Sequence, residues 1–311
     1  MKSPAFVDCY GDLADHLTPE ILAHCPGIEV ISGEPASEDE LIARLAGRRH
    51  AMVYMGYLSK RVLEACPELR SVAYLSTGLA THADLQDAGR LGVRIEGVRN
   101  YGDRAVAEHA ITLALSSLKR IAQADRLVRQ GGWQLLRTEE IAGATFGIVG
   151  FGGIGRETAR LAKALGAEVI GWSRSGDPGG CGATPVEFDE VVERSDILTL
   201  HLALTPDTAG IVSRDVFQRM KQDAILVNTA RGELIDRQAM LDALASGRIG
   251  HIALDVFHQE PLFLDDPLIG CDRVTLTPHS GWYTGRSIDN LLVAGLRVLR
   301  RHIEQSGHAD D

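Results

Sequence analysis

Short apolar runs alternate with amphipathic helical patterns along almost the whole chain, and this alternation restricts the fold more than any other feature. In the first hundred residues the apolar runs cover 5–7, 28–31, 51–55, 71–75 and 93–98. Helix-capping signals lie between them, at Thr18-Pro19, at Ser37 and at Ser59. Because strands that alternate with helices form parallel sheets covered by those helices, an α/β fold is predicted.

A second series of apolar runs follows a helical segment at 104–130, whose first half is apolar nearly all round and is expected to be buried. The runs cover 145–149, 168–172, 197–202, 224–228, 251–256 and 274–276. Six strands with helical spacers predict a doubly wound parallel sheet. Residues 284–303 form a last amphipathic pattern with no strand after it, so this helix is expected to pack on the first domain.

Length, charge and cysteine content limit the possible functions. A chain of 311 residues exceeds the size that one hydrophobic core serves well, so two domains are predicted. The net charge of −10, from scattered acidic residues, argues against nucleic-acid binding and favours small-molecule partners. The five cysteines form no CxxC pair, so neither a disulfide framework nor a metal site is predicted. No apolar run approaches the roughly 18 residues of a membrane span, and a cytoplasmic protein without membrane contact is expected.

Gly150, Gly152 and Gly155 have GxGxxG spacing directly after an apolar strand and before a helical run. The first glycine permits a tight turn, the second lets a pyrophosphate approach the backbone, and the third lets the helix pack closely on the strand. The helix N-terminus then faces the negative charge. The spacing alone is compatible with a coincidental glycine turn, but with strand and helix on either side the turn, including Gly153 and Ile154, is predicted to bind a dinucleotide.

The strand after this turn ends at Ser173-Arg174, where an NAD site carries an Asp or Glu that binds the adenosine ribose. A hydroxyl and an adjacent guanidinium can instead bind a 2′-phosphate, so NADP(H) is the preferred cofactor. NAD(H) is the alternative, in which Arg174 is a solvated loop residue. Asp177 lies too far into the following Pro-Gly turn to act as the ribose ligand.

Polar residues follow three of the later predicted strands: Arg231 in Asn-Thr-Ala-Arg-Gly, Glu260 before Pro261, and His279 after Pro278. Because the carboxyl ends of parallel strands meet at one edge of a sheet, Arg231, Glu260 and His279 can converge there. Separately, each has an ordinary interpretation as a surface charge, a loop residue or a turn. Their order after a dinucleotide turn favours a catalytic trio.

These four motifs resemble those of the D-isomer-specific 2-hydroxyacid dehydrogenases, a group that includes glyoxylate and hydroxypyruvate reductases, over essentially the whole chain. The resemblance implies a flavodoxin-like substrate domain formed by residues 1–100 plus 284–311. It implies a Rossmann-like NAD(P)-binding domain, residues 101–283, inserted into it. A homodimer is also implied, since residues 106–109 match the family's interdomain helix and Trp133 its dimer arm.

The implied reaction is hydride transfer between NADPH and a small 2-keto acid. Arg231, with its permanent charge, would hold the carboxylate and polarise the carbonyl. His279 would act as acid and base, since imidazole titrates at about 6.5, and Glu260 would favour and orient the imidazolium. The positions that resemble cofactor-lining residues are Thr229, Ala230 and Asp255.

The family binds the substrate carboxylate through backbone amides of a loop that corresponds here to Ser76, Thr77, Gly78 and Leu79. Two departures leave the keto acid open, with glyoxylate and hydroxypyruvate as first expectations. Loop 79–84 is one residue longer than usual, and 97–100 replaces the family's Asn-x-Pro-Gly. Phosphite is disfavoured as the substrate because Thr77 stands where phosphite dehydrogenase has a lysine. Formate is disfavoured because Pro278 stands where formate dehydrogenases have a glutamine. The alternative function is a nucleotide-sensing, corepressor-like binding protein on the same scaffold.

Overall fold

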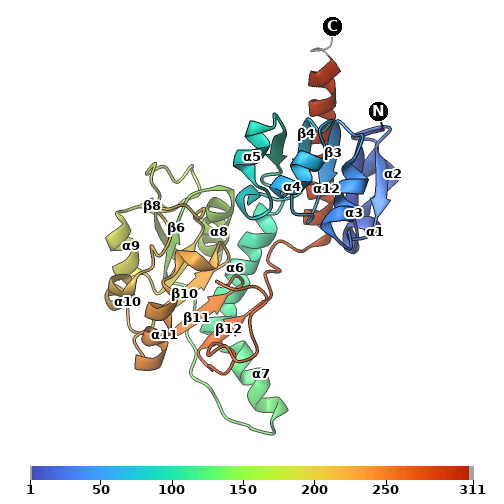
Figure 1. Cartoon of the computed structure of the whole chain (residues 1–311). Helices are drawn as coiled ribbons and strands as arrows, with labels where there is room; N and C mark the ends of the chain where they lie inside the picture. Colours follow the sequence, from blue (N-terminus) through green and yellow to red (C-terminus); the bar gives the residue numbers. More distant parts are fainter. Residues whose placement is uncertain (1, 308–311) are drawn as a thin grey trace. The chain divides into compact units, whose positions relative to one another are not determined.

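The computed structural model describes residues 2–307, and the chain divides into two compact units (Figure 1). The first unit consists of Met1–Gly102 and Tyr283–Asp311, and the second of Asp103–Trp282. The sequence places these boundaries after residues 100 and 283, and in the structure they fall after residues 102 and 282. Residues 1 and 308–311, which the predicted first domain includes, lie outside the described residues.

The first unit is built on a five-stranded parallel sheet in the order β2-β1-β3-β4-β5. Its strands are β1 (Ala5–Cys9), β2 (Glu29–Ser32), β3 (His50–Val53), β4 (Ser71–Tyr74) and β5 (Arg94–Gly97). Its helices are α1 (Asp12–His16), α2 (Pro19–Leu22), α3 (Glu38–Leu45), α4 (Lys60–Ala65), α5 (Leu85–Arg90) and α12 (Gly285–Gly307), with the 3-10 turn η1 (Leu79–Thr81). This order is that of flavodoxin-like folds, so the predicted doubly wound sheet is confirmed.

Three of the helices begin where the sequence indicates. The hydroxyl oxygens of Thr18, Ser37 and Ser59 each accept a hydrogen bond from a backbone amide three residues later, at 3.4, 3.2 and 3.2 Å. Each bond satisfies an amide that the first helical turn leaves without a partner. The capping signals therefore set the starts of α2, α3 and α4.

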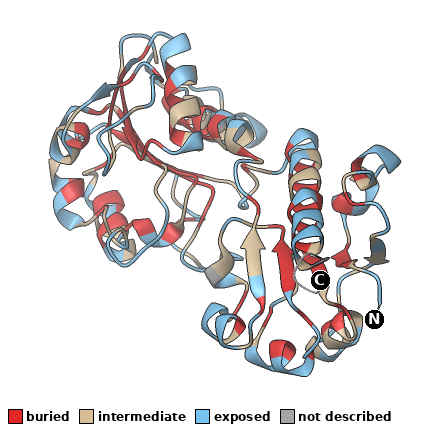
Figure 2. Cartoon of the chain, turned by 90° about the horizontal axis from the view of Figure 1, so that it is seen from above, coloured by how far each residue is buried: buried red, intermediate tan, exposed pale blue. Residues whose placement is uncertain are grey.

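Helix α12 packs on β3 and β4 and completes the core of the first unit. One face of the helix is buried (Figure 2), with Ile288, Leu291, Leu292, Leu296 and Leu299 at its centre. At Gly295 an added Cβ would lie 2.3 Å from Leu75 Cδ2 and 3.0 Å from Met52 Sδ, so the helix approaches the sheet more closely than a side chain would allow. The predicted packing of the last helix on the first domain is therefore confirmed.

The second unit contains a seven-stranded parallel sheet in the order β12-β11-β10-β9-β6-β7-β8. Its strands are β6 (Thr145–Val149), β7 (Glu168–Trp172), β8 (Thr184–Pro185), β9 (Ile197–Leu200), β10 (Ile225–Asn228), β11 (His251–Leu254) and β12 (Val274–Leu276). Its helices are α6 (Asp103–Leu118), α7 (Ile121–Arg129), α8 (Gly153–Ala164), α9 (Phe188–Arg194), α10 (Arg214–Arg219) and α11 (Arg237–Ser246), with the 3-10 turn η2 (Gly232–Leu234). Counted from β6, this is the Rossmann order with one further strand.

Two details of the second unit differ from the sequence prediction. The sheet has seven strands rather than six, because the two-residue β8 pairs with β7. The helical segment at 104–130 is two helices, α6 and α7, separated at Arg120, whose backbone is left-handed at φ 49°. The all-round apolar pattern stops at Leu118; α6 is buried against α8, whereas none of the residues of α7 is buried.

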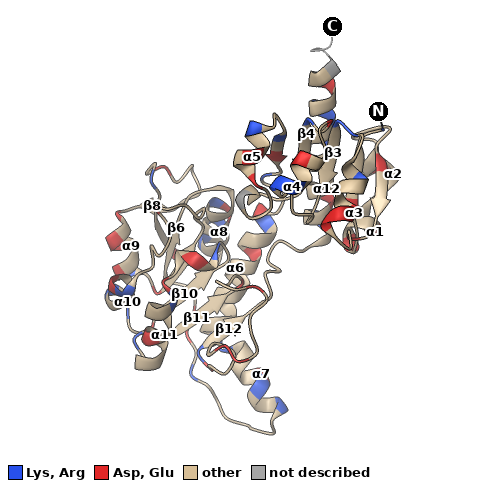
Figure 3. Ribbon diagram, in the orientation of Figure 1, with Lys and Arg blue, Asp and Glu red and all other residues tan. Residues whose placement is uncertain are grey.

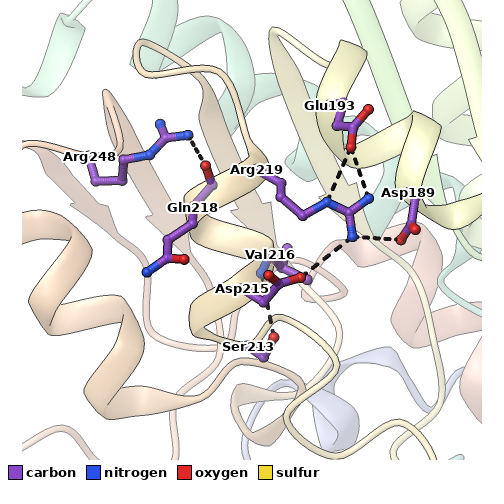
Figure 4. Close-up of polar contacts among 8 residues, drawn as sticks. All are labelled: Asp189, Glu193, Ser213, Asp215, Val216, Gln218, Arg219 and Arg248. Carbon is purple, nitrogen blue, oxygen red and sulfur yellow. Dashed lines mark hydrogen bonds and ion pairs between the residues drawn. The ribbon is translucent and has the colours of Figure 1, made fainter.

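Lys, Arg, Asp and Glu residues are distributed along the elements of both units (Figure 3). In the second unit, Arg219 joins α10 to α9, because its guanidinium lies 2.9 Å from Asp189, 3.0 Å from Glu193 and 3.5 Å from Asp215 (Figure 4).

Within the part of the chain that the structure describes, no helix has the length and apolar character to cross a membrane. The same residues contain no group of three or more His, Cys, Asp or Glu side chains that could hold a metal ion.

Candidate active site

The glycine turn between β6 and α8 has the geometry of a phosphate-binding turn. Gly150 has a φ of 107°, and a Cβ there would lie 2.6 Å from the His201 carbonyl oxygen. At Gly155 a Cβ would lie 1.9 Å from the Gly150 carbonyl oxygen, so only glycine lets α8 approach β6 this closely. Gly152 faces open space, and no side chain caps the N-terminus of α8. The first amides of α8 are therefore placed to bind an anion.

Gly153 and Ile154 begin α8, and Gly153 has a structural reason to be glycine. An added Cβ would lie 1.8 Å from Asp103 Oδ2, at the point where α6 crosses α8. Burial, together with the charge of Glu157, raises the pKa of the Asp103 carboxyl. A half-buried carboxyl thus lies beside the first turn of α8, and the absence of a side chain at Gly153 makes room for it.

The end of β7 carries no carboxylate at the residues that directly follow it. Ser173 Oγ lies 3.3 Å from Ser175 Oγ, and Arg174 is exposed. Asp177 is 70% exposed, and its Oδ1 accepts a hydrogen bond of 2.7 Å from the Gly179 amide. The groups that directly follow β7 are therefore hydroxyl and guanidinium groups.

Asn228, which ends β10, shapes the turn that carries Arg231. Its Nδ2 donates to the Arg231 carbonyl oxygen at 2.7 Å, and its Oδ1 accepts from the Ala230 amide at 3.0 Å. Arg231 Nη1 donates to the Ala230 carbonyl oxygen at 2.6 Å. Asn228 is fully buried and was not singled out from the sequence, although an amide at a strand end before an Arg is a signal for such a turn.

Thr229 lies within the same turn and has a buried hydroxyl without a partner among the described residues. A buried hydroxyl that finds no partner in the protein costs free energy, so a ligand that supplies one is favoured there. Together with the open face of Gly152, this orphaned group shows that the residues present fit a bound dinucleotide.

Glu260 and His279 form a direct pair. Glu260 Oε2 lies 2.8 Å from His279 Nδ1, and Glu260 Oε1 accepts a hydrogen bond of 2.9 Å from the Phe257 amide. The two side chains are 37% and 41% exposed. With its proton on Nδ1 donated to the carboxylate, the imidazole presents Nε2 to a ligand. The backbone of His279 is left-handed, with φ 53°, which is rare for a residue other than glycine.

Asp255 holds the turn that carries His279. Its Oδ1 accepts hydrogen bonds from Thr277 Oγ1 at 2.6 Å and the Ser280 amide at 2.9 Å, and its Oδ2 accepts from the Gly281 amide at 2.9 Å. His109 Nε2 lies 3.3 Å from Oδ1. Burial acts to raise the pKa of Asp255, but these hydrogen bonds outweigh it and the pKa is lowered. The sequence indicates a cofactor contact for Asp255 and places His109 in the interdomain helix; in the structure both residues also contact the 277–281 turn.

The segments that carry the trio follow three adjacent parallel strands, β10, β11 and β12. At Gly232, directly after Arg231, an added Cβ would lie 2.2 Å from the Phe257 carbonyl carbon and 2.6 Å from the His258 amide nitrogen. The turn after β10 is therefore in contact with the loop that leads to Glu260. Arg231, Glu260 and His279 all lie beyond the carboxyl edge of one sheet, where parallel α/β proteins bind their ligands.

The predicted carboxylate-binding loop belongs to the first unit, whereas the trio belongs to the second. The Ser76 amide donates to the Tyr74 carbonyl oxygen at 2.8 Å, and the Gly78 amide to Ser76 Oγ at 3.2 Å. Leu79 begins the turn η1. These bonds leave the Thr77 and Leu79 amides as the candidate donors to a carboxylate.

Comparison with known proteins gives a consistent result. Residues 111–281 match the family described as D-isomer specific 2-hydroxyacid dehydrogenase, NAD binding domain. A hydroxypyruvate reductase of Blautia hydrogenotrophica is 31% identical over 278 residues, 86% of each chain. An acyclic imino acid reductase, solved in complex with NADPH and D-Arg, is 28% identical over 97% of each chain, with a TM-score of 0.83. A D-lactate dehydrogenase with NAD+ from Lactobacillus jensenii is 26% identical over 94% of each chain, with a TM-score of 0.81.

Proposed function

This chain belongs to the D-isomer-specific 2-hydroxyacid dehydrogenase family, and we propose that it reduces a small 2-keto acid, with glyoxylate and hydroxypyruvate as the first substrates to test. The observation that carries the proposal is the Glu260–His279 pair, 2.8 Å apart. It lies beyond the strand edge that also presents Arg231. A carboxylate-supported imidazole and a guanidinium at the same sheet edge are the groups that reduction of a 2-keto acid requires.

Each residue of the trio has a distinct task in this proposal. Arg231 binds the substrate carboxylate and polarises the carbonyl with a charge that does not titrate. His279 holds a proton on Nε2 and gives it to the carbonyl oxygen; in the reverse direction Nε2 takes that proton back. Glu260 accepts a hydrogen bond from Nδ1, which fixes the orientation of the ring.

We propose NADP(H) as the preferred cofactor, with NAD(H) as the alternative. The reduced nicotinamide, when bound, supplies the hydride. The residues that would hold the dinucleotide are Gly150, Gly152, Gly153, Ile154, Gly155, Ser173, Arg174, Thr229, Ala230 and Asp255. The preference rests on hydroxyl and guanidinium groups, instead of a carboxylate, after β7. Structural neighbours solved with NADPH and with NAD+ both exist, so binding must be measured.

For the substrate carboxylate we propose Ser76, Thr77, Gly78 and Leu79 in addition to Arg231. Backbone amides suit an anion because they bring no charge that must be removed from water. Thr77→Pro removes one of the two candidate amides; it should raise KM for the keto acid and leave the Kd of the cofactor unchanged. An unchanged KM would exclude the Thr77 amide from substrate binding.

A homodimer in a reducing compartment, the cytoplasm, is proposed. Helix α7 and the segment after it expose large apolar side chains: Ile121 57%, Val128 53%, Trp133 89% and Leu135 102%. Such a set of exposed apolar side chains favours a protein interface. All five cysteines carry free thiols, as a reducing compartment maintains. The double change Trp133→Ala and Leu135→Ala should yield a monomer in sedimentation, and a wild type that sediments as a monomer would exclude the dimer.

The function is tested by following oxidation of NADPH and NADH with glyoxylate, hydroxypyruvate, pyruvate, oxaloacetate and phosphonopyruvate. Turnover of one acid should be lost in His279→Ala and kept in His258→Ala, which removes an exposed imidazole near the site. Cofactor binding without turnover of any acid would favour the corepressor-like alternative. The comparisons do not favour that alternative, since the relatives reported above are named reductases and dehydrogenases.

A further inference from the structure

A glycine-rich loop follows β7 and wraps around an arginine of α8. Gly176, Gly179, Gly180 and Gly182 have φ values of 68°, 60°, 67° and 83°, which side chains rarely adopt. Arg156, which directly follows the glycine turn, reaches this loop: a Cβ at Gly179 would lie 2.4 Å from Arg156 Nε and 2.5 Å from Cζ. The loop backbone therefore packs directly on the guanidinium.

The guanidinium of Arg156 makes one long ion pair and no hydrogen bond within the described part of the chain. Among residues 2–307 the only carboxylate within 4.0 Å is Asp177, whose Oδ2 lies 4.0 Å from Nη2, beyond hydrogen-bond distance. Arg156 Nε is buried and has no partner in the described part of the chain. The next arginine of α8 behaves differently, since Arg160 pairs with Glu157 at 2.9 Å. The loop fixes the position of the Arg156 guanidinium, whose N–H groups make no hydrogen bond in the described part of the chain. Its side chain is 38% exposed.

Arg156 lies beside the loop that follows β7, and this position indicates which anion it could bind. In a Rossmann sheet, the residues after the strand that follows the glycine turn face the adenosine ribose. That strand is β7, and the loop it leads into contains Ser173, Arg174 and Gly179, which packs on Arg156. A phosphate on the 2′ position of that ribose is a dianion that a guanidinium can bind with two donors.

We propose that Arg156 binds the 2′-phosphate of NADP(H) together with Ser173 and Arg174, and that Asp177 is its counter-ion when the phosphate is absent. The inference rests on the proposed NADP(H) preference and adds a residue from α8 to it. Asp177 is 70% exposed and is held by the Gly179 amide, so it stays near Arg156 without consuming the Nη donors. Lys163 supports the far end of the loop, where its Nζ donates to the Gly182 carbonyl oxygen at 3.0 Å.

The test compares Arg156→Gln with Arg160→Gln, which removes the same charge from the same helix. Dissociation constants are measured by calorimetry for NADPH, NADH, 2′,5′-ADP and 5′-AMP, so the readout does not depend on turnover. Arg156→Gln should weaken NADPH and 2′,5′-ADP by about 10- to 100-fold, as expected for loss of charge-assisted hydrogen bonds. It should change the constants for NADH and 5′-AMP by less than about 3-fold. Arg160→Gln should leave all four unchanged.

A second variant, Asp177→Asn, removes an exposed negative charge and keeps a side-chain oxygen that can accept from the Gly179 amide. It should strengthen NADPH binding by about 3-fold at low salt and leave NADH unchanged, since it removes a competing anion from Arg156.

The possible results separate the two proposals. If the wild type prefers NADPH but Arg156→Gln keeps that preference, the role of Arg156 is wrong and the cofactor proposal stands. If Arg156→Gln weakens NADH and NADPH equally, the arginine only supports the loop, and the inference is again overturned. If the wild type binds 2′,5′-ADP no better than 5′-AMP and prefers NADH, both proposals fail.

Discussion

The substitution Asp255→Asn tests whether the buried carboxylate positions the turn that carries His279. Asp255 is 2% exposed, and three protein donors bond to its two oxygens at 2.6 to 2.9 Å. An asparagine has only one carbonyl oxygen, so its NH2 group must face either the Gly281 amide or the Thr277 and Ser280 donors. In both orientations a buried donor meets another donor.

The magnitude follows from this count of hydrogen bonds. A hydrogen bond to a charged group contributes about 1.5–3 kcal/mol, and a buried donor left without an acceptor costs about 1–3 kcal/mol. We expect the free energy of unfolding to fall by about 2–4 kcal/mol in Asp255→Asn. Because His279 has a left-handed backbone that this turn maintains, kcat should fall about 100-fold, as for a displacement of about 1 Å.

The assay combines urea unfolding with steady-state kinetics, and Asp196→Asn is the matched control. Asp196 also accepts a hydrogen bond from a backbone amide, that of Thr145 at 2.8 Å, but it lies at the amino end of β9. The control should lose stability and keep kcat. If Asp255→Asn keeps kcat within about 3-fold while losing as much stability as the control, the positioning role is refuted.

The pH dependence of stability provides a second test of the role of Asp255. The pKa of Asp255 is lowered in the folded protein, so its contribution to stability is complete above the unfolded value of about 3.9. That contribution is lost as the pH falls through the lowered folded value. Wild type should therefore lose more stability than Asp255→Asn on acidification below about pH 4.

Three further predictions follow from the second unit. Gly232→Ala should lower kcat about 100-fold, because its Cβ would lie 2.2 Å from the Phe257 backbone in the loop that leads to Glu260. Gly270→Ala, at a position with open space around it, should leave kcat unchanged, and equal kcat values for the two variants would contradict this prediction. Burial and nearby arginines lower the pKa of His251 to about 4. As the pH falls from about 6.5 to 4, the free energy of unfolding should therefore fall by up to about 3 kcal/mol. His251→Gln lacks the titrating group and should not show this loss in urea unfolding. Arg219→Ala should lower the free energy of unfolding at low salt and should lower it by less at high salt, and a salt-independent loss would exclude the ion pairs of Figure 4 as its cause.

The sequence predicts most of the fold because strands buried on both faces are recognisable as short apolar runs. β9 and β10, for example, are fully buried and lie within the predicted runs. The strand β8 lacks this signal, since its two residues are exposed and one is Pro185. The break at Arg120 was also not predicted, because no Gly or Pro marks it and the backbone there adopts an unusual conformation.

The sequence predicts which residues follow the strand ends, and the topology then brings those strand ends together. It does not predict which side chains support them. Asn228 carries a sequence signal, since an amide at a strand end before an Arg favours such a turn. His109 and Arg156 carry none, because their contacts depend on side-chain directions that only the packed structure sets. Asp255 shows the same limit, because only the structure reveals that both its oxygens are used by the turn around His279.

The arrangement of α12 has a consequence for biosynthesis. The sheet of the first unit leaves the ribosome before the second unit, but the helix that covers β3 and β4 leaves it after the second unit. The second unit is continuous in sequence, so it can mature while the earlier-made sheet still exposes apolar side chains. The first unit therefore lacks part of its core until the second unit has been made. A message truncated after residue 282 would yield a complete second unit attached to an uncovered sheet, a product that chaperones and proteases recognise.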